Sequence, residues 1–182
     1  MSQSPVVEAD DATDATLPSV VGKLAVAIRD QLGSGEVAEL RRISPHEPYT
    51  PALWKLLLTY VPDGWTTGPQ RDEKERRWAA LLMGMAITAG LHDHSVPLGR
   101  ALAEAGWSEL RFVRLMRDEG DSLMERVRRL AQYLASKAQP ADWTDVAHIL
   151  LDQQGDWAER HRMRIARDYY RTLYQQESRQ SD

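Results

Sequence analysis

The spacing of apolar residues constrains this chain most, because it follows the period of an α-helix from residue 19 to about residue 175. In the first such segment Val20, Leu24, Ile28 and Leu32 fall on one helical face. No stretch alternates apolar and polar residues between turn signals, as a half-buried β-strand would. The sequence therefore predicts an all-α fold of the helical-bundle type.

Glycine, proline and capping residues divide the helical pattern into segments. Residues 61–70 hold two prolines and two glycines, which predicts a connection. A break near residues 92–96 predicts an N-terminal helical lobe over 18–92 and a C-terminal helical bundle over 96–176, although two lobes that share one core remain an alternative. The predicted helices are Ser19 to Leu32, Glu36 to Ile43, Pro51 to Tyr60, Asp72 to Leu91, Pro97 to Ala105, Ser108 to Arg117, Asp121 to Ser136, Asp142 to Leu151 and Asp156 to about Gln175.

Charge is unevenly distributed along the 182 residues. The sequence has 27 acidic and 23 basic side chains, and its formal net charge is -4. Four of the acids, Glu8, Asp10, Asp11 and Asp14, lie in residues 1–17, which we expect to be a disordered acidic tail. The remaining 23 acids balance the 23 bases. An anionic partner would therefore be recognised through the arrangement of charges and not through their sum.

Composition excludes several classes of protein. The chain has no cysteine, so disulfide scaffolds, thiolate nucleophiles and zinc sites with Cys ligands are excluded. The N-terminus lacks an apolar run behind a basic region, and the longest uncharged core stretch, Trp78 to Leu91, is too short to span a bilayer. We expect a cytoplasmic protein with no membrane partner.

The usual catalytic patterns are missing. Gly33-Ser34-Gly35 leads into Glu36 and resembles a helix stop more than a phosphate-binding loop. The His92-Asp93-His94 triplet is better interpreted as a polar interhelical loop than as a metal site, and we expect no second pair of His and Asp at ligand spacing on a helix to support a metal. His148 is expected to be a hydrogen-bonded helix residue, while His46 and His161 have no evident partner. The sequence thus predicts no catalytic residue, no cofactor and no metal.

Arginine outnumbers lysine 19 to 4 and gathers on single faces of three predicted helices. Such cationic faces are typical of proteins that follow a sugar-phosphate backbone, and an interleaved aromatic ring can stack on an exposed base. Ordinary solvated helix faces, compensated by acids on neighbouring helices, explain them about equally well. The faces consist of Arg111, Arg114 and Arg117 on the first helix, Arg126, Arg129, Tyr133 and Lys137 on the second, and Arg160, Arg164, Arg167 and Arg171 on the third.

Five segments resemble, in order and spacing, the CasB family, the small subunit of the type I-E CRISPR surveillance complex Cascade. The resemblance covers about residues 22–174, although the acidic tail has no counterpart and the last helix aligns loosely. The segments are GEVAELRR at 35–42, PLGRALA at 97–103, SELRFVRLMR at 108–117, VRRL at 127–130 and ADW at 141–143.

The resemblance implies a non-catalytic, all-helical subunit present as a head-to-tail pair inside a crRNA-guided complex. Its partners would be the other Cascade subunits, the crRNA and the target DNA, including the displaced strand, and its role would be to stabilise the R-loop. Basic positions that carry over from matching motifs are Arg41, Arg42, Arg111, Arg117, Arg128 and Arg129. By helical phase, Arg128 points away from Arg126 and toward an interhelical or partner contact.

Two other functions stay open at this point. One is a helical adaptor whose arginine faces bind acidic protein partners and no nucleic acid. The other is a helix-turn-helix regulator that uses Ala101 to Arg117, where Gly106 separates two helices.

Overall fold

The computed structural model describes residues 15–44 and 47–180, so residues 1–14 of the predicted tail, including its four acids, and His46 lie outside the described part of the chain. Leu17, which the sequence assigned to the tail, is the first residue of the first helix. The described residues form helices and no β-strand; their only β-type pairing is the pair of isolated bridges Ser44–Glu47 and His92–Ala141. The all-α prediction is confirmed. No helix among the described residues is long and apolar enough to cross a membrane.

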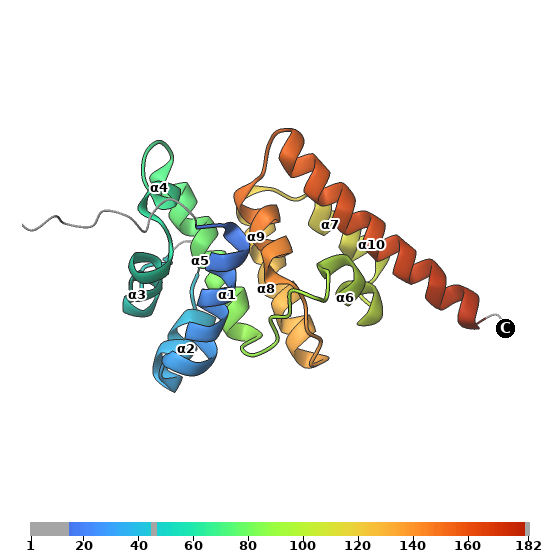
Figure 1. The fold of residues 1–182 in the computed structure, drawn as a ribbon, viewed down its shortest axis with the longest axis horizontal. Helices are drawn as coiled ribbons and strands as arrows, with labels where there is room; N and C mark the ends of the chain where they lie inside the picture. The colour runs from blue at the N-terminus through green and yellow to red at the C-terminus, as the bar shows by residue number, and fades with distance from the viewer. Residues whose placement is uncertain (1–14, 45–46, 181–182) are drawn as a thin grey trace, which may run out of the picture.

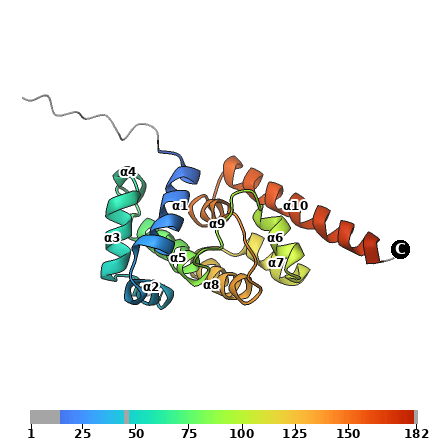
Figure 2. The same cartoon turned by 60° about the horizontal axis from the view of Figure 1, so that its bottom comes forward.

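The first half of the chain forms one end of the molecule (Figures 1 and 2). Threonine side chains cap α1 and α3 as N-cap acceptors, and each of these helices has a proline in its first turn. The elements here are α1 (Leu17–Val26), a π-helical turn (Ala27–Gln31), α2 (Ser34–Arg41), α3 (Pro51–Tyr60), α4 (Asp63–Thr66) and α5 (Arg71–Ile87).

Several boundaries differ from the sequence prediction. Helix α2 begins at Ser34 and ends at Arg41 instead of spanning Glu36 to Ile43, and the last helix continues to Gln180 instead of ending near Gln175. The connection at 61–70 contains the short helix α4, because Trp65 stacks on Trp78 of α5 at a centroid distance of 6.2 Å and holds the turn against the core. Helix α5 ends at Ile87, earlier than predicted, since the hydroxyl of Thr88 donates to the carbonyl of Gly84 and Gly90 follows at a φ of 84°.

The second half forms the other end, with the long helix α10 running along it to the C-terminus (Figures 1 and 2). The side chain of Asp142 accepts a hydrogen bond from the backbone N–H of Thr144, which caps α9. The elements here are α6 (Leu98–Glu104), α7 (Glu109–Arg117), α8 (Gly120–Ser136), α9 (Trp143–Leu151) and α10 (Asp156–Gln180).

Helix α5 joins the two ends. Its residues 78–86 are buried, and the helix contacts α2 and α3 of the first half of the chain and α8 and α9 of the second half. Buried apolar residues from both sides of residues 92–96 form one continuous cluster. The division into lobes at this point stays a prediction.

Two glycines allow close packing between helices. A Cβ on Gly99 of α6 would lie 2.1 Å from the carbonyl oxygen of Ile165 and 2.8 Å from the amide nitrogen of Tyr169, both in the backbone of α10. A Cβ on Gly84 of α5 would lie 2.5 Å from the ring of Trp143. The position of α10 therefore depends on the absence of a side chain at Gly99.

Candidate nucleic-acid interface

Helices α7 and α8 enclose a shallow hollow of about 450 Å³, which we call the cationic groove. It brings together residues from two of the arginine faces that the sequence singled out. Its lining consists of Trp107, Arg111, Arg114, Arg126, Arg129, Gln132 and Tyr133.

The buried side of α7 sets the direction of its arginines. Phe112 and Leu115 are 1% exposed, so Arg111, Arg114 and Arg117 face outward. Phe112 stacks on Tyr169 of α10 with ring centroids 4.0 Å apart. The Tyr169 hydroxyl donates to the carbonyl of Trp107 at 2.6 Å, and burial raises the pKa of this phenol to about 12. This packing fixes the α7 face relative to α10.

Aromatic rings line one side of the groove. Trp107 and Tyr133 meet edge to face at 4.9 Å, and the Tyr133 hydroxyl donates to the carbonyl of Ala105 at 2.7 Å. The guanidinium of Arg111 lies 5.4 Å from the centre of the Trp107 ring, and the Lys137 ammonium lies 5.8 Å from that of Tyr133. Cations and rings are thus adjacent, as they are in sites that bind single strands.

The charges around the groove are unequally compensated. Arg126 forms a half-buried ion pair with Asp118, while Arg129 is 3.5 Å from Glu125 in an exposed contact that contributes little. Within residues 15–44 and 47–180, no carboxylate pairs with Arg111, Arg114 or Arg117. These three arginines keep a net positive charge available to a ligand.

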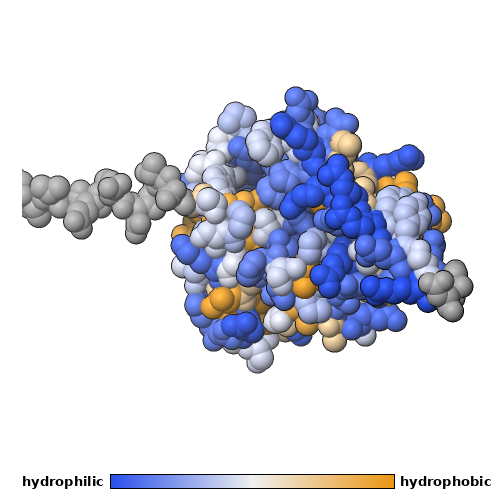
Figure 3. Space-filling view, turned by 45° about the vertical axis from the view of Figure 1, so that its right-hand side comes forward, coloured by the Kyte–Doolittle hydropathy of each residue, from blue (hydrophilic) through white to orange (hydrophobic). Residues whose placement is uncertain are grey.

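The arginines of α10 differ from those of α7 in the partners that they contact. The guanidinium of Arg164 lies 2.5 Å from the carboxylate of Asp145, a buried residue of α9, and Arg160 stacks over Trp157 at 4.6 Å. Arg167 and Arg171 are exposed, and no ion pair involves them in the described part of the chain. Figure 3 shows a band of hydrophilic residues along α10.

The α10 face is compensated from another helix. Within the described residues no ion pair joins Asp156 or Asp168 to it, and the carboxylate that pairs with it is Asp145 of α9. Asp145 also accepts a hydrogen bond from the backbone N–H of Leu98 at 2.9 Å. Burial is the main reason that the pKa of Asp145 is raised. This residue therefore holds α6, α9 and α10 together.

Three further predicted residues make hydrogen bonds within the chain, and two of them link different helices. Arg41 donates to the carbonyl of Ala86 at 2.9 Å, and Arg42 donates to that of Ala38 within α2. Arg128 of α8 donates to the backbone carbonyls of Arg41 and Ile43, which confirms the interhelical contact that its helical phase predicted.

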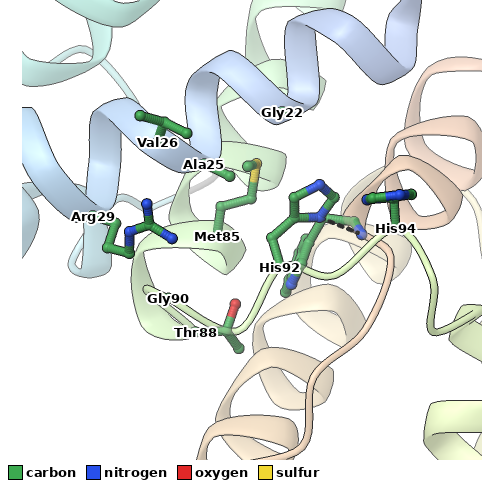
Figure 4. Close-up of a pocket in the computed structure, with 10 residues that line it drawn as sticks. Gly22, Ala25, Val26, Arg29, Met85, Thr88, Gly90, His92 and His94 are labelled. Atoms are coloured by element: carbon green, nitrogen blue, oxygen red, sulfur yellow. Dashed lines mark hydrogen bonds between the residues drawn. The ribbon is translucent and has the colours of Figure 1, made fainter.

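The His92-Asp93-His94 segment lies beside a separate hollow of about 240 Å³, shown in Figure 4. His92 Nδ1 accepts a hydrogen bond from the backbone N–H of Trp143, and burial lowers the pKa of His92, which keeps this nitrogen unprotonated. The Asp93 carboxylate accepts from the amide and the hydroxyl of Ser95. The prediction of a polar interhelical loop is confirmed.

Sequence reasoning missed several residues. Gln132 lines the groove, and Trp107 both packs in the core and lines the groove. The expectation that no second His and Asp pair stands at ligand spacing is wrong, because His148 of α9 and Asp152, the C-cap residue of that helix, are four residues apart and their side chains lie 2.8 Å apart. The spacing was visible in the sequence, whereas the approach of His161 depends on how α10 folds back.

The fold and the site together define the class of this protein, which is an all-helical protein with an arginine-lined groove. Residues 36–170 match the family model of CRISPR-associated protein Cse2, so the chain belongs to that family. A comparison with curated protein sequences gives no match.

Two solved structures have a similar fold. A chain in the crystal structure of E. coli Cascade bound to a PAM-containing dsDNA target with a 32-nt spacer is 25% identical, with a TM-score of 0.65, over 85% of this chain and 96% of that one. CasB from Thermobifida fusca is 19% identical, with a TM-score of 0.64, over 84% of this chain and 94% of that one.

Proposed function

We propose that this chain is a non-catalytic small subunit of a crRNA-guided surveillance complex and that it stabilises the R-loop. The observation that carries the proposal is the cationic groove, where Arg111 and Arg114, which have no acidic partner among the described residues, border the rings of Trp107 and Tyr133. The exposed Arg117 lies on the same helix. Membership of the Cse2 family and the likeness to a chain of DNA-bound Cascade support it.

The mechanism is electrostatic. Guanidinium groups of Arg111, Arg114 and Arg117 bind phosphates of a strand without reading its bases, and base pairing with the guide supplies the sequence specificity. Because strand exchange in an R-loop is close to balance, a few phosphate contacts suffice to hold it open. The partners are the other Cascade subunits, the crRNA and the target DNA, including the displaced strand, with two copies arranged head to tail.

The thirteen residues that the sequence selected divide into two roles in this proposal. Arg41, Arg128 and Arg164 make contacts between elements and act mainly by positioning helices, while Arg42 bonds the backbone of its own helix. The remaining members contact the nucleic-acid backbone directly: Arg111, Arg114, Arg117, Arg126, Arg129, Lys137, Arg160, Arg167 and Arg171.

The test is the lifetime of the R-loop in the assembled complex. We expect replacement of Arg111 and Arg117 with Ala to shorten it several-fold, with the fold unchanged because both side chains are exposed. The matched control replaces Arg29 and Arg100 with Ala, which removes the same charge from exposed ion pairs elsewhere. An unchanged lifetime at matched salt, with the subunit still incorporated, would contradict the proposal and favour a protein-interaction adaptor.

A further inference from the structure

Three side chains that could bind a metal meet where α9 ends and α10 begins. The Nδ1 atom of His148 lies 2.8 Å from a carboxylate oxygen of Asp152, and the rings of His148 and His161 stack with centroids 3.7 Å apart. One ligand atom from each of the three residues lies within 4.8 Å of the other two. The three residues are partly buried, at the surface of two different helices.

We propose that His148, Asp152 and His161 bind a divalent transition-metal ion of the zinc type. Two imidazoles and a carboxylate are a ligand set that suits zinc, nickel or copper better than magnesium or calcium, which prefer oxygen ligands. Ligand atoms bound to one ion at about 2.0 Å stand about 3 Å apart, close to the separation of His148 and Asp152.

Binding requires release of the proton that His148 Nδ1 donates to Asp152, and one local rearrangement. The lone pair of a ring nitrogen lies in the plane of the ring, and the two histidine rings are only 12° from parallel. The rings must therefore rotate about their Cβ–Cγ bonds so that both lone pairs meet at one ion. The partial exposure of both side chains leaves room for this rotation.

The surroundings leave a coordination position open. A hollow of about 530 Å³ borders His148 and Asp152 and gives solvent access, so water completes the coordination shell. The basic residues that line it are engaged: Lys74 donates to the carbonyl of Thr67, and Arg77 pairs with Glu73. Arg164, next along α10, pairs with Asp145.

The bound ion would link α9 to the first turns of α10. His148 lies in the last turn of α9, Asp152 is the C-cap residue of that helix, and His161 lies in α10, which begins at Asp156. An ion held by both helices stabilises the folded chain by mass action and fixes the direction in which α10 leaves α9.

The experiment is titration of the full-length, untagged protein with Zn²⁺, followed by calorimetry and by the temperature of unfolding. We expect one ion per chain and a rise in Tm with Zn²⁺. His161→Gln and Asp152→Asn should each weaken binding by about tenfold or more and abolish the rise in Tm. His94→Gln, which changes an exposed histidine outside the cluster, should bind Zn²⁺ as the unsubstituted protein does.

A second readout locates the ion. The ring of Trp157 lies 5.9 Å from that of His161 and is 67% exposed. Cu²⁺ bound at the cluster should quench its fluorescence, and Trp157→Phe should remove most of this quenching. Absence of Zn²⁺ binding, or binding that survives in His161→Gln with an unchanged affinity, would overturn the proposal.

Discussion

Helices α7 and α10 carry the same sequence pattern and use it differently. Each has arginines on the face opposite its apolar residues, spaced by three residues on α7 and by four, three and four on α10. On α7, Arg111, Arg114 and Arg117 have no acidic partner among the described residues, whereas on α10 Arg164 is held by the buried carboxylate of Asp145. The neighbouring helix, and not the pattern, decides whether an arginine is free to bind a ligand.

The largest effect should come from breaking the packing of α10. Gly99→Ala would place a methyl group 2.1 Å from the backbone of α10, where a rigid helix cannot give way as a flexible side chain can. We expect a loss of at least about 3 kcal/mol in the free energy of unfolding, measured by denaturant titration. Gly22→Ala, in the interior of α1 with nothing within 4 Å of the added Cβ, should stabilise slightly. Equal stabilities of the two variants would contradict this account.

Arg164→Ala separates the two uses of arginine. It leaves Asp145, whose side chain is 3% exposed, without its ion-pair partner. We expect the free energy of unfolding to fall by about 2 kcal/mol, while Arg111→Ala changes it by less than about 0.5 kcal/mol. Chemical denaturation of the two variants side by side measures the free energy of unfolding. A similar loss in both would show that Arg164 and Arg111 do not differ in their contribution to stability.

The next prediction concerns DNA binding by the arginines of α7. An Arg111, Arg114 and Arg117 triple Ala variant should bind single-stranded DNA about tenfold more weakly in about 0.1 M salt, and the slope of log affinity against log salt should fall by up to about three. A salt series read by fluorescence anisotropy measures both quantities. The control triple variant replaces Arg29, Lys55 and Arg100, which lie in exposed ion pairs, and should keep most of the slope.

Asp118→Asn should leave Arg126 without its ion-pair partner, as the arginines of α7 are among the described residues. The substitution removes the carboxylate that pairs with Arg126 and keeps the size of the side chain. Since Arg126 lines the cationic groove, we expect DNA binding to strengthen about threefold. The same anisotropy assay tests it, and weaker binding would show that the ion pair positions the groove instead of neutralising it.

The smallest effect concerns pH. Burial raises the pKa of Asp145 above its ordinary value of 3.8, so the folded state takes up this proton more readily than the unfolded chain does. The contribution of Asp145 to stability therefore falls as pH rises from about 4 through the raised pKa, and is constant above it. The difference in unfolding free energy between the unsubstituted protein and Asp145→Asn, measured from pH 4 to 7, should show this slope. A difference that rises over the same range would contradict a raised pKa of Asp145.

Local patterns explain what could be predicted. Apolar periodicity and capping residues such as Thr50 located the long helices, and the faces of α7 and α8 followed from their phase. Helix α4 escaped prediction because the stacking of Trp65 on Trp78 outweighs a segment rich in Pro and Gly.

Contacts between distant residues explain what could not be predicted. Asp145 and Arg164 are 19 positions apart on different helices, and no spacing rule links them. For the same reason His161 could not be joined to His148 and Asp152 in advance.

Helix α5 has a consequence for dividing the molecule. Because residues 78–86 are covered by helices from both halves of the chain, each half buries apolar side chains of the other. A chain cut near residues 92–96 would leave apolar surfaces open to water on both fragments. Neither fragment would keep the packing that it has in the whole chain, and the two fragments would associate with each other or aggregate.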